Sequence, residues 1–498
     1  MGFRPPTVSS PRGPVPTIFV VATIIWFIFA YSQQAFGARN LSSGSKPVSN
    51  LRTAQQPIGA AKVSVSVSAI SDVARHFADW PPQAPYDNSF GETGSRLKLI
   101  RQWVELAESS AVNDADRDTI HAAVETVIGA QFPFLVRAEN KTRPFAALRE
   151  SFTQERGIVI PTGTKTFRHA CHLVATLRRT LRTSLPIEVF YAGEKDLPAS
   201  QRQTLAQLGQ VDGGGGIEFI DVLRRFDDRT LKLATGGWAI KAFAALGSRF
   251  AEAVVLDADA VFVQPPDVLL AQRGYAETGA LMFHDRLLWQ GAFPARHNWW
   301  HSQVRQPSEA LNRSLVWTQR YAEEADSGVV VLDKGRLGVL LGLLHVAWQN
   351  TKAVRDDVTY KLMYGDKESW WLGMELAGAP YSFEKYYAAV AGWPQGQAPD
   401  GGSAEAGKIC SFVIAHLDED DRLLWYNGGL PKNKMTLPAT FEVPTHWMVN
   451  GTWHKGASKQ DMSCMDGKQA VALTDAELGV LRSSMDVAQG VDKTWSLI

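Results

Sequence analysis

The chain has 498 residues, of which 45% are hydrophobic and 20% are charged. This length and composition are ordinary for a globular protein and leave room for one large domain or two. The 51 basic residues balance the 51 acidic residues, and because nucleic-acid-binding proteins usually carry a basic excess, the composition argues against a nucleic-acid partner.

An uncharged apolar segment lies near the N-terminus, from Thr17 to Tyr31. It is slightly shorter than the usual membrane span of about 20 residues, but the thinner membranes of the early secretory pathway would accommodate it. Arg4 and Arg12 precede it without any acidic residue, which favours a cytosolic N-terminus. We therefore expect an uncleaved type II anchor; a signal peptide cut after Ala38 is the alternative.

The next part of the chain has few aromatic residues and is rich in Ser, Ala, Val and Gln, which is typical of a flexible stem. Apolar residues then recur at helical spacing around Leu97 to Leu106 and again from Asp114. We expect the following organisation: a cytosolic tail at 1–16, a transmembrane anchor at 17–31, a stem at 32–80, a helical subdomain at 81–150 and one α/β domain at 151–498.

Strands and helices alternate in the α/β part, which predicts a largely parallel sheet with right-handed crossovers. A helix is expected around Leu173, between the first two strands. The other expected helices cover 238–246, 336–348 and 368–376. The expected strands cover 157–161, 187–191, 217–220, 253–256, 280–283, 327–333 and one late segment at 409–415.

Two aspartates follow one of these strands. Asp257 and Asp259 flank Ala258 directly after Leu256, and alternate side chains of an extended chain point the same way. Two like charges side by side are unfavourable unless a cation joins them. Carboxylate oxygens suit Mg²⁺ or Mn²⁺, and ligands of open α/β sheets bind just past the carboxyl ends of strands. The pair predicts a divalent-metal site, with a solvated turn as the alternative.

Three cysteines, Cys171, Cys410 and Cys464, allow at most one internal disulfide. We expect a bridge between Cys410 and Cys464, since both fall late in the chain, and a buried thiol at Cys171. Asn-x-Ser/Thr triplets, which fit a luminal body, occur only after the apolar segment, at Asn40, Asn140, Asn312 and Asn450.

In this setting the Asp-x-Asp pair resembles the metal and nucleotide-sugar motif of the glycosyltransferase A fold. With it, further segments resemble the fungal α-mannosyltransferases of glycosyltransferase family 71, Golgi enzymes that extend mannan and O-linked chains. The resemblance implies an α/β fold of glycosyltransferase A type, a Rossmann-like mixed sheet flanked by helices. It rests on the order and spacing of the segments 157–166, 185–197, 237–241, 257–259, 324–328, 365–368, 416–418 and 424–427.

The resemblance also implies a metal site and a donor site. Asp259 would bind the metal directly, and Asp257 would reach it through water or hold the donor ribose. His416 resembles a late histidine that supplies a further metal ligand; a hydrogen-bonded structural histidine is the alternative. The base and ribose of the nucleotide would lie by Thr162, Gly163 and Lys165. Lys241 would reach the diphosphate or the sugar, or is a solvated lysine.

Three acidic residues are expected near the reacting sugar. Asp326 would face the donor sugar, and Asp366 or Glu368 would lie near the reacting carbon or grip the acceptor hydroxyls. The alternative is that Asp366 caps the following helix and Glu368 lies in its first turn. Several tryptophans are also expected in the region, most of them in the core and some stacked on the acceptor: Trp289, Trp299, Trp300, Trp370 and Trp371.

The predicted function is a retaining transfer of mannose from GDP-mannose, with Mn²⁺ or Mg²⁺, to a mannose-ended glycan on glycoproteins or mannan. The enzyme would be a single-pass type II protein of the Golgi membrane with a luminal catalytic domain. The nearest alternative is a transferase of the same fold that uses a UDP-sugar. A glycoside hydrolase built on a carboxylate pair and a catalytically silent glycan-binding protein are further alternatives.

Overall fold

The computed structural model describes residues 67–210, 215–395 and 407–497. The expected cytosolic tail, the transmembrane anchor and most of the stem lie outside these residues. Within the described ranges, no helix has both the length and the apolar character needed to cross a membrane.

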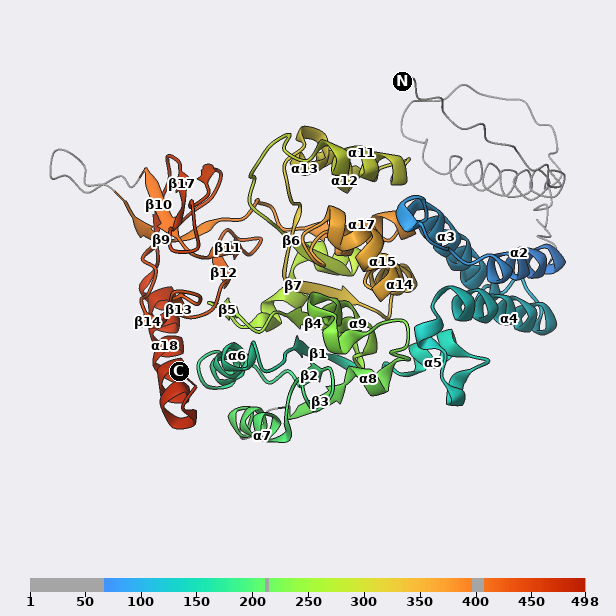
Figure 1. Cartoon of the computed structure of the whole chain (residues 1–498), viewed down its shortest axis with the longest axis horizontal. Helices are drawn as coiled ribbons and strands as arrows, with labels where there is room; N and C mark the ends of the chain where they lie inside the picture. Colours follow the sequence, from blue (N-terminus) through green and yellow to red (C-terminus); the bar gives the residue numbers. More distant parts are fainter. Residues whose placement is uncertain (1–66, 211–214, 396–406, 498) are drawn as a thin grey trace, which may run out of the picture.

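A seven-stranded mixed sheet forms the centre of the molecule (Figure 1). Its strand order is β3-β2-β1-β4-β7-β6-β8. β7 runs antiparallel to both of its neighbours, and every other pairing in the sheet is parallel. The expected mixed and largely parallel sheet is therefore confirmed. The strands are β1 (Gln154–Pro161), β2 (Ile187–Tyr191), β3 (Ile217–Asp221), β4 (Phe250–Leu256), β6 (Ala280–His284), β7 (Ala325–Asp333) and β8 (Ser382–Phe383).

Successive residues of a strand point to opposite faces of the sheet, and these strands are apolar at both sets of positions. Both faces of the sheet are therefore apolar, and helices cover each of them. Ile158 and Ile160 of β1 pack in one hydrophobic cluster with α6 (Phe167–Arg179) and α7 (Ala199–Leu208). Val159, between them, belongs to a second cluster. That cluster contains residues of α9 (Ile240–Gly247), α14 (Leu337–Gln349) and α17 (Ser369–Ala377).

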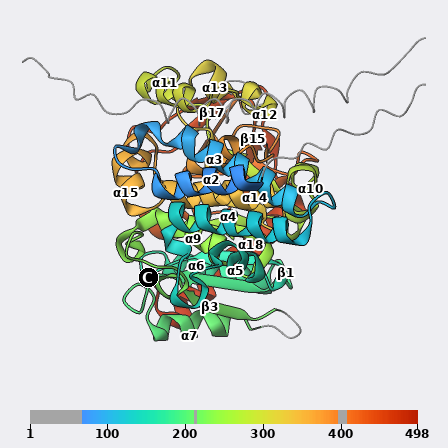
Figure 2. The same ribbon diagram turned by 90° about the vertical axis from the view of Figure 1, so that its right-hand side faces the viewer.

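Four helices precede the sheet, and their buried side chains belong to the same hydrophobic cluster as those of α14 and α17. Figure 2 shows α2, α3 and α4 near α14. α2 lies in the range expected as a flexible stem, which is a correction, because its apolar residues recur every three to four positions. Ile70, Ala74 and Phe77 of α2 are buried. The helices are α2 (Val67–Asp79), α3 (Phe90–Ala107), α4 (Asp114–Gln131) and α5 (Pro144–Glu150), with short turns η1 (Tyr86–Asn88), η2 (Pro133–Leu135) and η3 (Ala138–Asn140).

The C-terminal part forms smaller sheets. β10 (Lys408–Ser411) and β11 (Ile414–Leu417) replace the single strand expected at 409–415. The Ser411 hydroxyl accepts the Val413 N–H at 3.2 Å, and the chain bends there, so that the two strands enter different sheets. The other strands are β5 (Ala260–Phe262), β9 (Val390–Pro394), β12 (Leu423–Asn427), β13 (Pro431–Asn433), β14 (Leu437–Phe441), β15 (His446–Met448), β16 (Thr452–His454), β17 (Ser463–Asp466) and β18 (Val471–Ala472).

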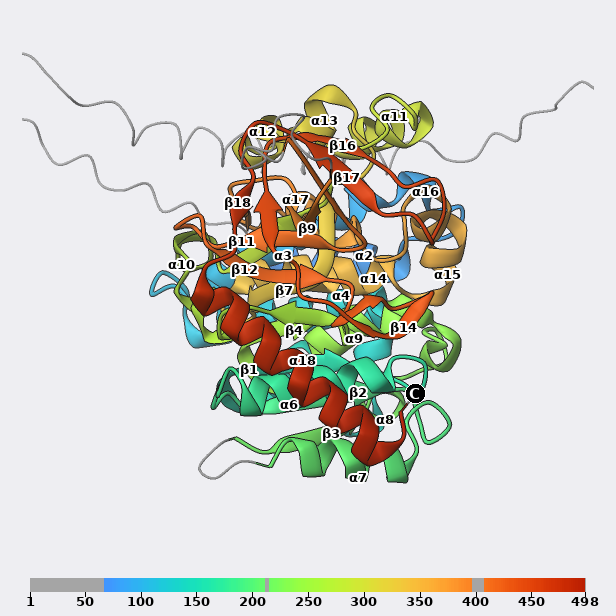
Figure 3. The same cartoon turned by 90° about the vertical axis from the view of Figure 1, so that its left-hand side faces the viewer.

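Two features fasten this part of the molecule. Cys410 and Cys464 form a disulfide between β10 and β17, and Cys171 is a buried free thiol, so both expectations are confirmed. The last helix, α18 (Asp475–Trp495), crosses the molecule in front of α6 (Figure 3). Asp492 of α18 accepts hydrogen bonds from the Arg168 guanidinium at 2.6 and 2.9 Å.

The remaining helical segments are short. Most of them lie in the connections between strands on the side of the sheet that bears the candidate site. They are α8 (Val222–Arg225), η4 (Leu233–Thr235), η5 (Gly237–Ala239), η6 (Pro266–Ala271), α10 (Arg273–Thr278), α11 (Pro294–Gln303), α12 (Glu309–Arg313), α13 (Leu315–Gln319), α15 (Lys352–Val354), η7 (Arg355–Thr359) and α16 (Tyr360–Leu362).

Candidate functional site

The candidate site lies at one edge of the central sheet. Val159 of β1 pairs with Val255 of β4 in parallel, so the residues that follow β1 and β4 leave the sheet at the same edge. β7 runs the other way, and Leu256 pairs with Val329. The N–H of Asp257 donates to the Gly328 carbonyl at 2.8 Å. The sheet topology therefore brings the ends of β1 and β4 and the start of β7 to one place.

A buried lysine is the centre of this edge. Lys241, in the first turn of α9, is only 3% exposed. Its Nζ lies 2.8 Å from Asp257 Oδ1 and 3.2 Å from Asp366 Oδ2. It also donates to the carbonyl and hydroxyl oxygens of Ser327 at 2.9 and 3.0 Å. Burial opposes the charge, but the two carboxylates raise the pKa of Lys241 above its usual value, so it is a cation that joins α9, β4 and the loop before α17.

The negative charges around Lys241 exceed the positive ones. Burial, together with the nearby Asp259 and Asp366, raises the pKa of Asp257 to about 6 despite the opposing effect of Lys241. The Asp257 side chain is 28% exposed and that of Asp259 is 17% exposed. The two aspartates are thus partly accessible from outside, whereas the lysine is enclosed.

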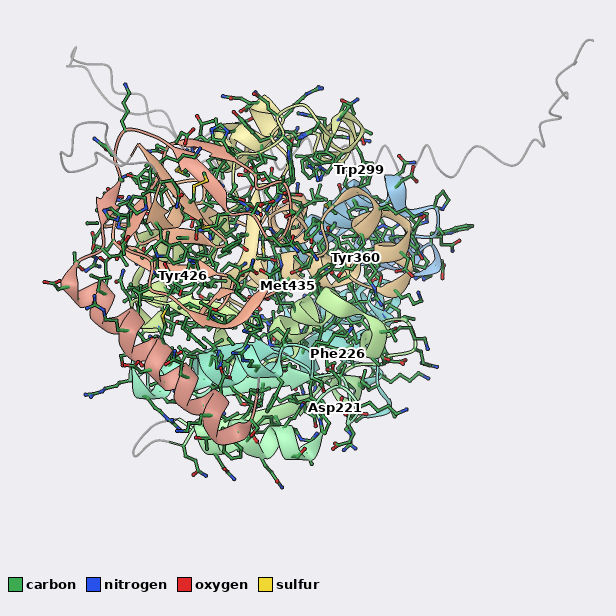
Figure 4. The ribbon with its side chains drawn as sticks, turned by 60° about the vertical axis from the view of Figure 1, so that its left-hand side comes forward. Asp221, Phe226, Trp299, Tyr360, Tyr426 and Met435 are labelled. Atoms are coloured by element: carbon green, nitrogen blue, oxygen red, sulfur yellow. A yellow bond between two sulfur atoms is a disulfide. The ribbon has the colours of Figure 1, made fainter. Side chains whose placement is uncertain are left out.

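Asp259 pairs with a second lysine that sequence reasoning missed. Lys434, in the turn after β13, forms an ion pair with Asp259 Oδ2, and the backbone N–H groups of Gly428 and Gly429 donate to the Asp259 carbonyl. Met435, the residue after Lys434, is 60% exposed. Its label in Figure 4, near that of Tyr360, marks where this turn lies. Because Lys434 lies 175 residues from Asp259 in a turn of no regular pattern, no sequence signal pointed to this pair.

The two aspartates suit a divalent cation, but the expected set of three ligands does not form. Carboxylate oxygens are hard donors, and Mg²⁺ is commonly held by one or two carboxylates together with substrate phosphates. In the part of the chain that the structure describes, no group of three or more His, Cys, Asp and Glu side chains is arranged to hold a metal ion. Asp257 and Asp259 supply hard oxygen donors for such an ion, although each also contacts a lysine. His416 is not placed with them.

His416 belongs to a different, fully enclosed cluster. Its Nε2 lies 3.2 Å from Asp326 Oδ2 and its Nδ1 lies 2.5 Å from Glu384 Oε1. The ring also stacks on Trp425, with centroids 4.3 Å apart. Burial opposes the charge of the imidazole, but Glu384 and Asp326 raise the pKa of His416 to about 9. Both nitrogens face carboxylates, as the structural alternative describes. The role of His416 as a metal ligand stays a prediction.

Asp326 is engaged by the same cluster. Its Oδ1 accepts hydrogen bonds from the Gly328 N–H at 3.0 Å and from Asn427 Nδ2 at 2.9 Å. It is 1% exposed. Burial would raise its pKa, but the hydrogen bond from His416 and the charge of Lys367 hold the pKa of Asp326 below its usual value. Its carboxylate is enclosed by protein groups and does not reach the accessible side of the edge.

Asp366 and Glu368 lie in one turn but face different partners. Asp366 Oδ2 accepts the Trp370 indole N–H at 2.9 Å and contacts Lys241. Glu368 is completely buried and accepts the Glu324 N–H at 3.0 Å and the Trp371 indole N–H at 2.6 Å. Neither side chain caps α17. Asp366 thus adjoins the candidate site, whereas Glu368 holds the start of β7, and sequence alone gave no sign of its backbone partners.

The loop after β1 has the geometry of a tight turn. Thr162 Oγ1 lies 2.8 Å from Thr166 Oγ1, and the Gly163 N–H donates to the Thr166 hydroxyl at 3.3 Å. A Cβ on Gly163 would lie 2.1 Å from Asp196 Oδ1, so only glycine fits. Lys165 is exposed. These residues lie at the same sheet edge as Asp257, because β1 and β4 are parallel neighbours.

A family model described as "Mannosyltransferase putative" (Mannosyl_trans3) matches residues 155–418. This segment is more than half of the chain, and it contains the central sheet together with Lys241, Asp257 and Asp366. The chain belongs to this family. The expected resemblance to fungal α-mannosyltransferases is confirmed.

Curated relatives in yeast are similar over part of their length. Alpha-1,3-mannosyltransferase MNT3 of Saccharomyces cerevisiae is 32% identical over 221 residues, which are 39% of this chain and 34% of MNT3. Alpha-1,3-mannosyltransferase MNN1 of the same yeast is 26% identical over 324 residues, which are 55% of this chain and 40% of MNN1. The chain therefore spans less than half of the length of these relatives.

Solved structures that resemble the chain share little sequence with it. The mannosyltransferase Ktr4p of S. cerevisiae has a TM-score of 0.30 and 10% identity, over 63% of this chain and 82% of Ktr4p. The galactosyltransferase LgtC has a TM-score of 0.28 and 15% identity, over 46% of this chain and 72% of LgtC.

Proposed function

We propose that this chain transfers mannose from GDP-mannose to a mannose-ended glycan on glycoproteins or mannan, with retention of the α configuration. The observation that carries the proposal is the accessible pair Asp257 and Asp259 beside Lys241, inside the segment that matches the mannosyltransferase family. The yeast relatives are named alpha-1,3-mannosyltransferases, which favours an α-1,3 linkage in the product.

The reaction breaks the bond between the sugar C1 and the phosphate oxygen and forms a bond from C1 to an acceptor hydroxyl oxygen, which loses its proton. Negative charge collects on the departing diphosphate. A divalent cation, Mn²⁺ or Mg²⁺, held by Asp257 and Asp259 would stabilise that charge. Lys241 keeps the Asp257 carboxylate in place, because it is itself fixed by the two Ser327 oxygens and by Asp366.

Other residues receive roles that follow from their partners. The turn with Thr162, Gly163 and Lys165 is proposed to hold the base and ribose of the nucleotide, since it leaves the sheet beside Asp257. Asp366 is proposed to act next to the donor through Lys241. Asp326 and Glu368 are proposed as positioning residues, because their carboxylates are enclosed by protein donors.

The secretory pathway is the proposed location, in the Golgi lumen with an N-terminal membrane anchor. The Cys410–Cys464 disulfide supports it, because such bonds persist in oxidising compartments and are rare in the cytosol.

The test is a transfer assay on the purified full chain with mannobiose as acceptor. GDP-mannose is compared with UDP-galactose, each with Mn²⁺ and with EDTA, and the linkage of the product is determined. We expect an α-linked trisaccharide from GDP-mannose with Mn²⁺ only. Turnover with UDP-galactose alone would reassign the donor. Release of free mannose from mannobiose without donor or metal would indicate a hydrolase, and binding without transfer would indicate a silent glycan-binding protein.

A further inference from the structure

Two large aromatic side chains lie exposed close in the sequence to Lys241 and Asp366. Trp238 is 54% exposed and Tyr364 is 62% exposed. Their rings adjoin, with centroids 5.7 Å apart and an interplanar angle of 41°. By contrast, Trp300, Trp370 and Trp371 are buried in the core. Adjoining exposed aromatic rings leave apolar surface in water, and such surface commonly marks a binding site.

The backbone holds this aromatic pair in place. Gly365 has a φ of +63°, and a Cβ there would lie 2.8 Å from Trp238 Cε3, so glycine permits the indole to lie against the turn. The edge of Tyr360 also contacts Trp238, at a centroid distance of 6.4 Å. The Tyr360 hydroxyl donates to Asn350 Oδ1 at 3.0 Å, which fixes that ring. Trp238 therefore packs against Gly365 and Tyr360, while much of its surface remains exposed.

Both aromatic residues lie within three residues, in the sequence, of a residue that belongs to the acidic edge. Trp238 lies in η5, three residues before Lys241, which contacts Asp257. Tyr364 lies two residues before Asp366, which contacts the same lysine. The ammonium group of Lys367 lies 5.8 Å from the centre of the Tyr364 ring. The pair is thus attached on both sides to the residues that we propose to serve the donor.

We infer that Trp238 and Tyr364 form the platform on which the acceptor mannose residue stacks, an inference that rests on the proposed function. A pyranose ring carries C–H groups on its faces and hydroxyls at its edge. Aromatic faces accommodate the apolar faces of such a ring. The ligand class is a mannose-ended oligosaccharide.

Steady-state kinetics on the full chain test this assignment, with GDP-mannose as donor and mannobiose as acceptor. Trp238→Ala and Tyr364→Ala should each raise the KM for mannobiose about tenfold and leave the KM for GDP-mannose near that of the wild type. Trp238→Phe and Tyr364→Phe keep a ring and should recover most of the affinity. Trp80→Ala is the matched control, since Trp80 is 65% exposed after α2, in the helical part. Thermal melting confirms that each variant is folded.

The outcomes separate this inference from the proposed function. An unchanged KM for mannobiose in both alanine variants, or an equal rise in both KM values, would overturn the platform while transfer stands. If the wild-type chain transfers no mannose, mannobiose binding is measured by tryptophan fluorescence. A saturable change that is lost in Trp238→Phe then supports the platform as a glycan site although the proposed function has failed. Its absence in the wild type, or its persistence in the variant, overturns the platform.

Discussion

Two groups of buried charges lie at the same edge of the central sheet and differ in their access to solvent. In one, His416 lies between Asp326 and Glu384, and the three side chains are 0%, 1% and 6% exposed. In the other, Lys241 is equally enclosed, but Asp257 is 28% exposed. Every member of the first group is enclosed by protein. The second presents carboxylates outward, as a binding site for a cation and a phosphate requires.

This difference in solvent access separates a group that stabilises the fold from a group that can take part in the reaction. Burying a paired charge rarely adds much stability, yet removing one partner leaves an uncompensated charge and is strongly destabilising. We therefore expect changes in the His416 group to affect folding and changes in the Asp257 group to affect transfer.

His416→Gln should destabilise the chain by about 3–5 kcal/mol, because Asp326 and Glu384 would remain buried without their cation. Denaturant unfolding measures the loss. The Mn²⁺ concentration for half-maximal activity should not change in the folded variant. A marked rise in that concentration, with normal stability, would return His416 to the metal site.

Asp259→Asn should lower transfer by about 10²- to 10³-fold, since it weakens the electrostatic stabilisation of the departing diphosphate, while the melting temperature stays near that of the wild type. Asp421→Asn is the matched control, because Asp421 pairs with Lys385 at the surface, with side chains 45% and 56% exposed. Equal activities of the two variants would remove Asp259 from the site.

The free energy of unfolding should depend on pH through the enclosed group of His416, Asp326 and Glu384. Glu384 and Asp326 face His416 and raise its pKa to about 9, against an ordinary 6.5. The folded state thus binds an extra proton between these values, so its stability is complete below about pH 6.5 and declines by roughly 3 kcal/mol as pH rises through about 9. His416→Gln should flatten this slope in unfolding experiments. An equally steep slope in the variant would assign it to another group.

Lys434→Gln should have the smallest effect. Lys434 is 35% exposed and forms an ion pair with Asp259, so it would compete with a cation bound there. Its loss should lower the Mn²⁺ requirement about two- to fivefold, the size expected of a partly solvated ion pair. Lys432→Gln, which breaks the pair of Lys432 with Glu442, serves as control. A higher KM for GDP-mannose with an unchanged Mn²⁺ requirement would instead assign Lys434 to the diphosphate.

Local pattern predicted the central fold well. β2 has the expected bounds, Ile187–Tyr191, and β1, β4, β6 and β7 extend the expected strands by a few residues at most. These strands are apolar runs between helices, so their signal is contained in short windows. The C-terminal sheets were not predicted, because strands such as β15 and β16 have three residues each and are defined by distant partners. α18 was also missed, although Thr474 and Glu477 form a capping box before it.

The site was predicted only in part, for a similar reason. The sequence placed Asp257 and Asp259 correctly after β4, since an apolar strand followed by two acids is a local feature. The sequence could not show that the Glu368 carboxylate accepts hydrogen bonds from the backbone N–H groups of Glu324 and Ala325. These partners are 44 and 43 residues away and leave no local pattern. Trp238 and Tyr364 were overlooked, since exposure is a tertiary property.

We propose that the accessible acidic edge at Asp257 and Asp259 serves sugar transfer. The most direct measurement compares the full chain with the double variant Asp257→Ala/Asp259→Ala for transfer from GDP-mannose to mannobiose, with melting curves of both. We predict that the double variant stays folded and forms no detectable trisaccharide. A folded double variant that transfers mannose at the wild-type rate would contradict the account.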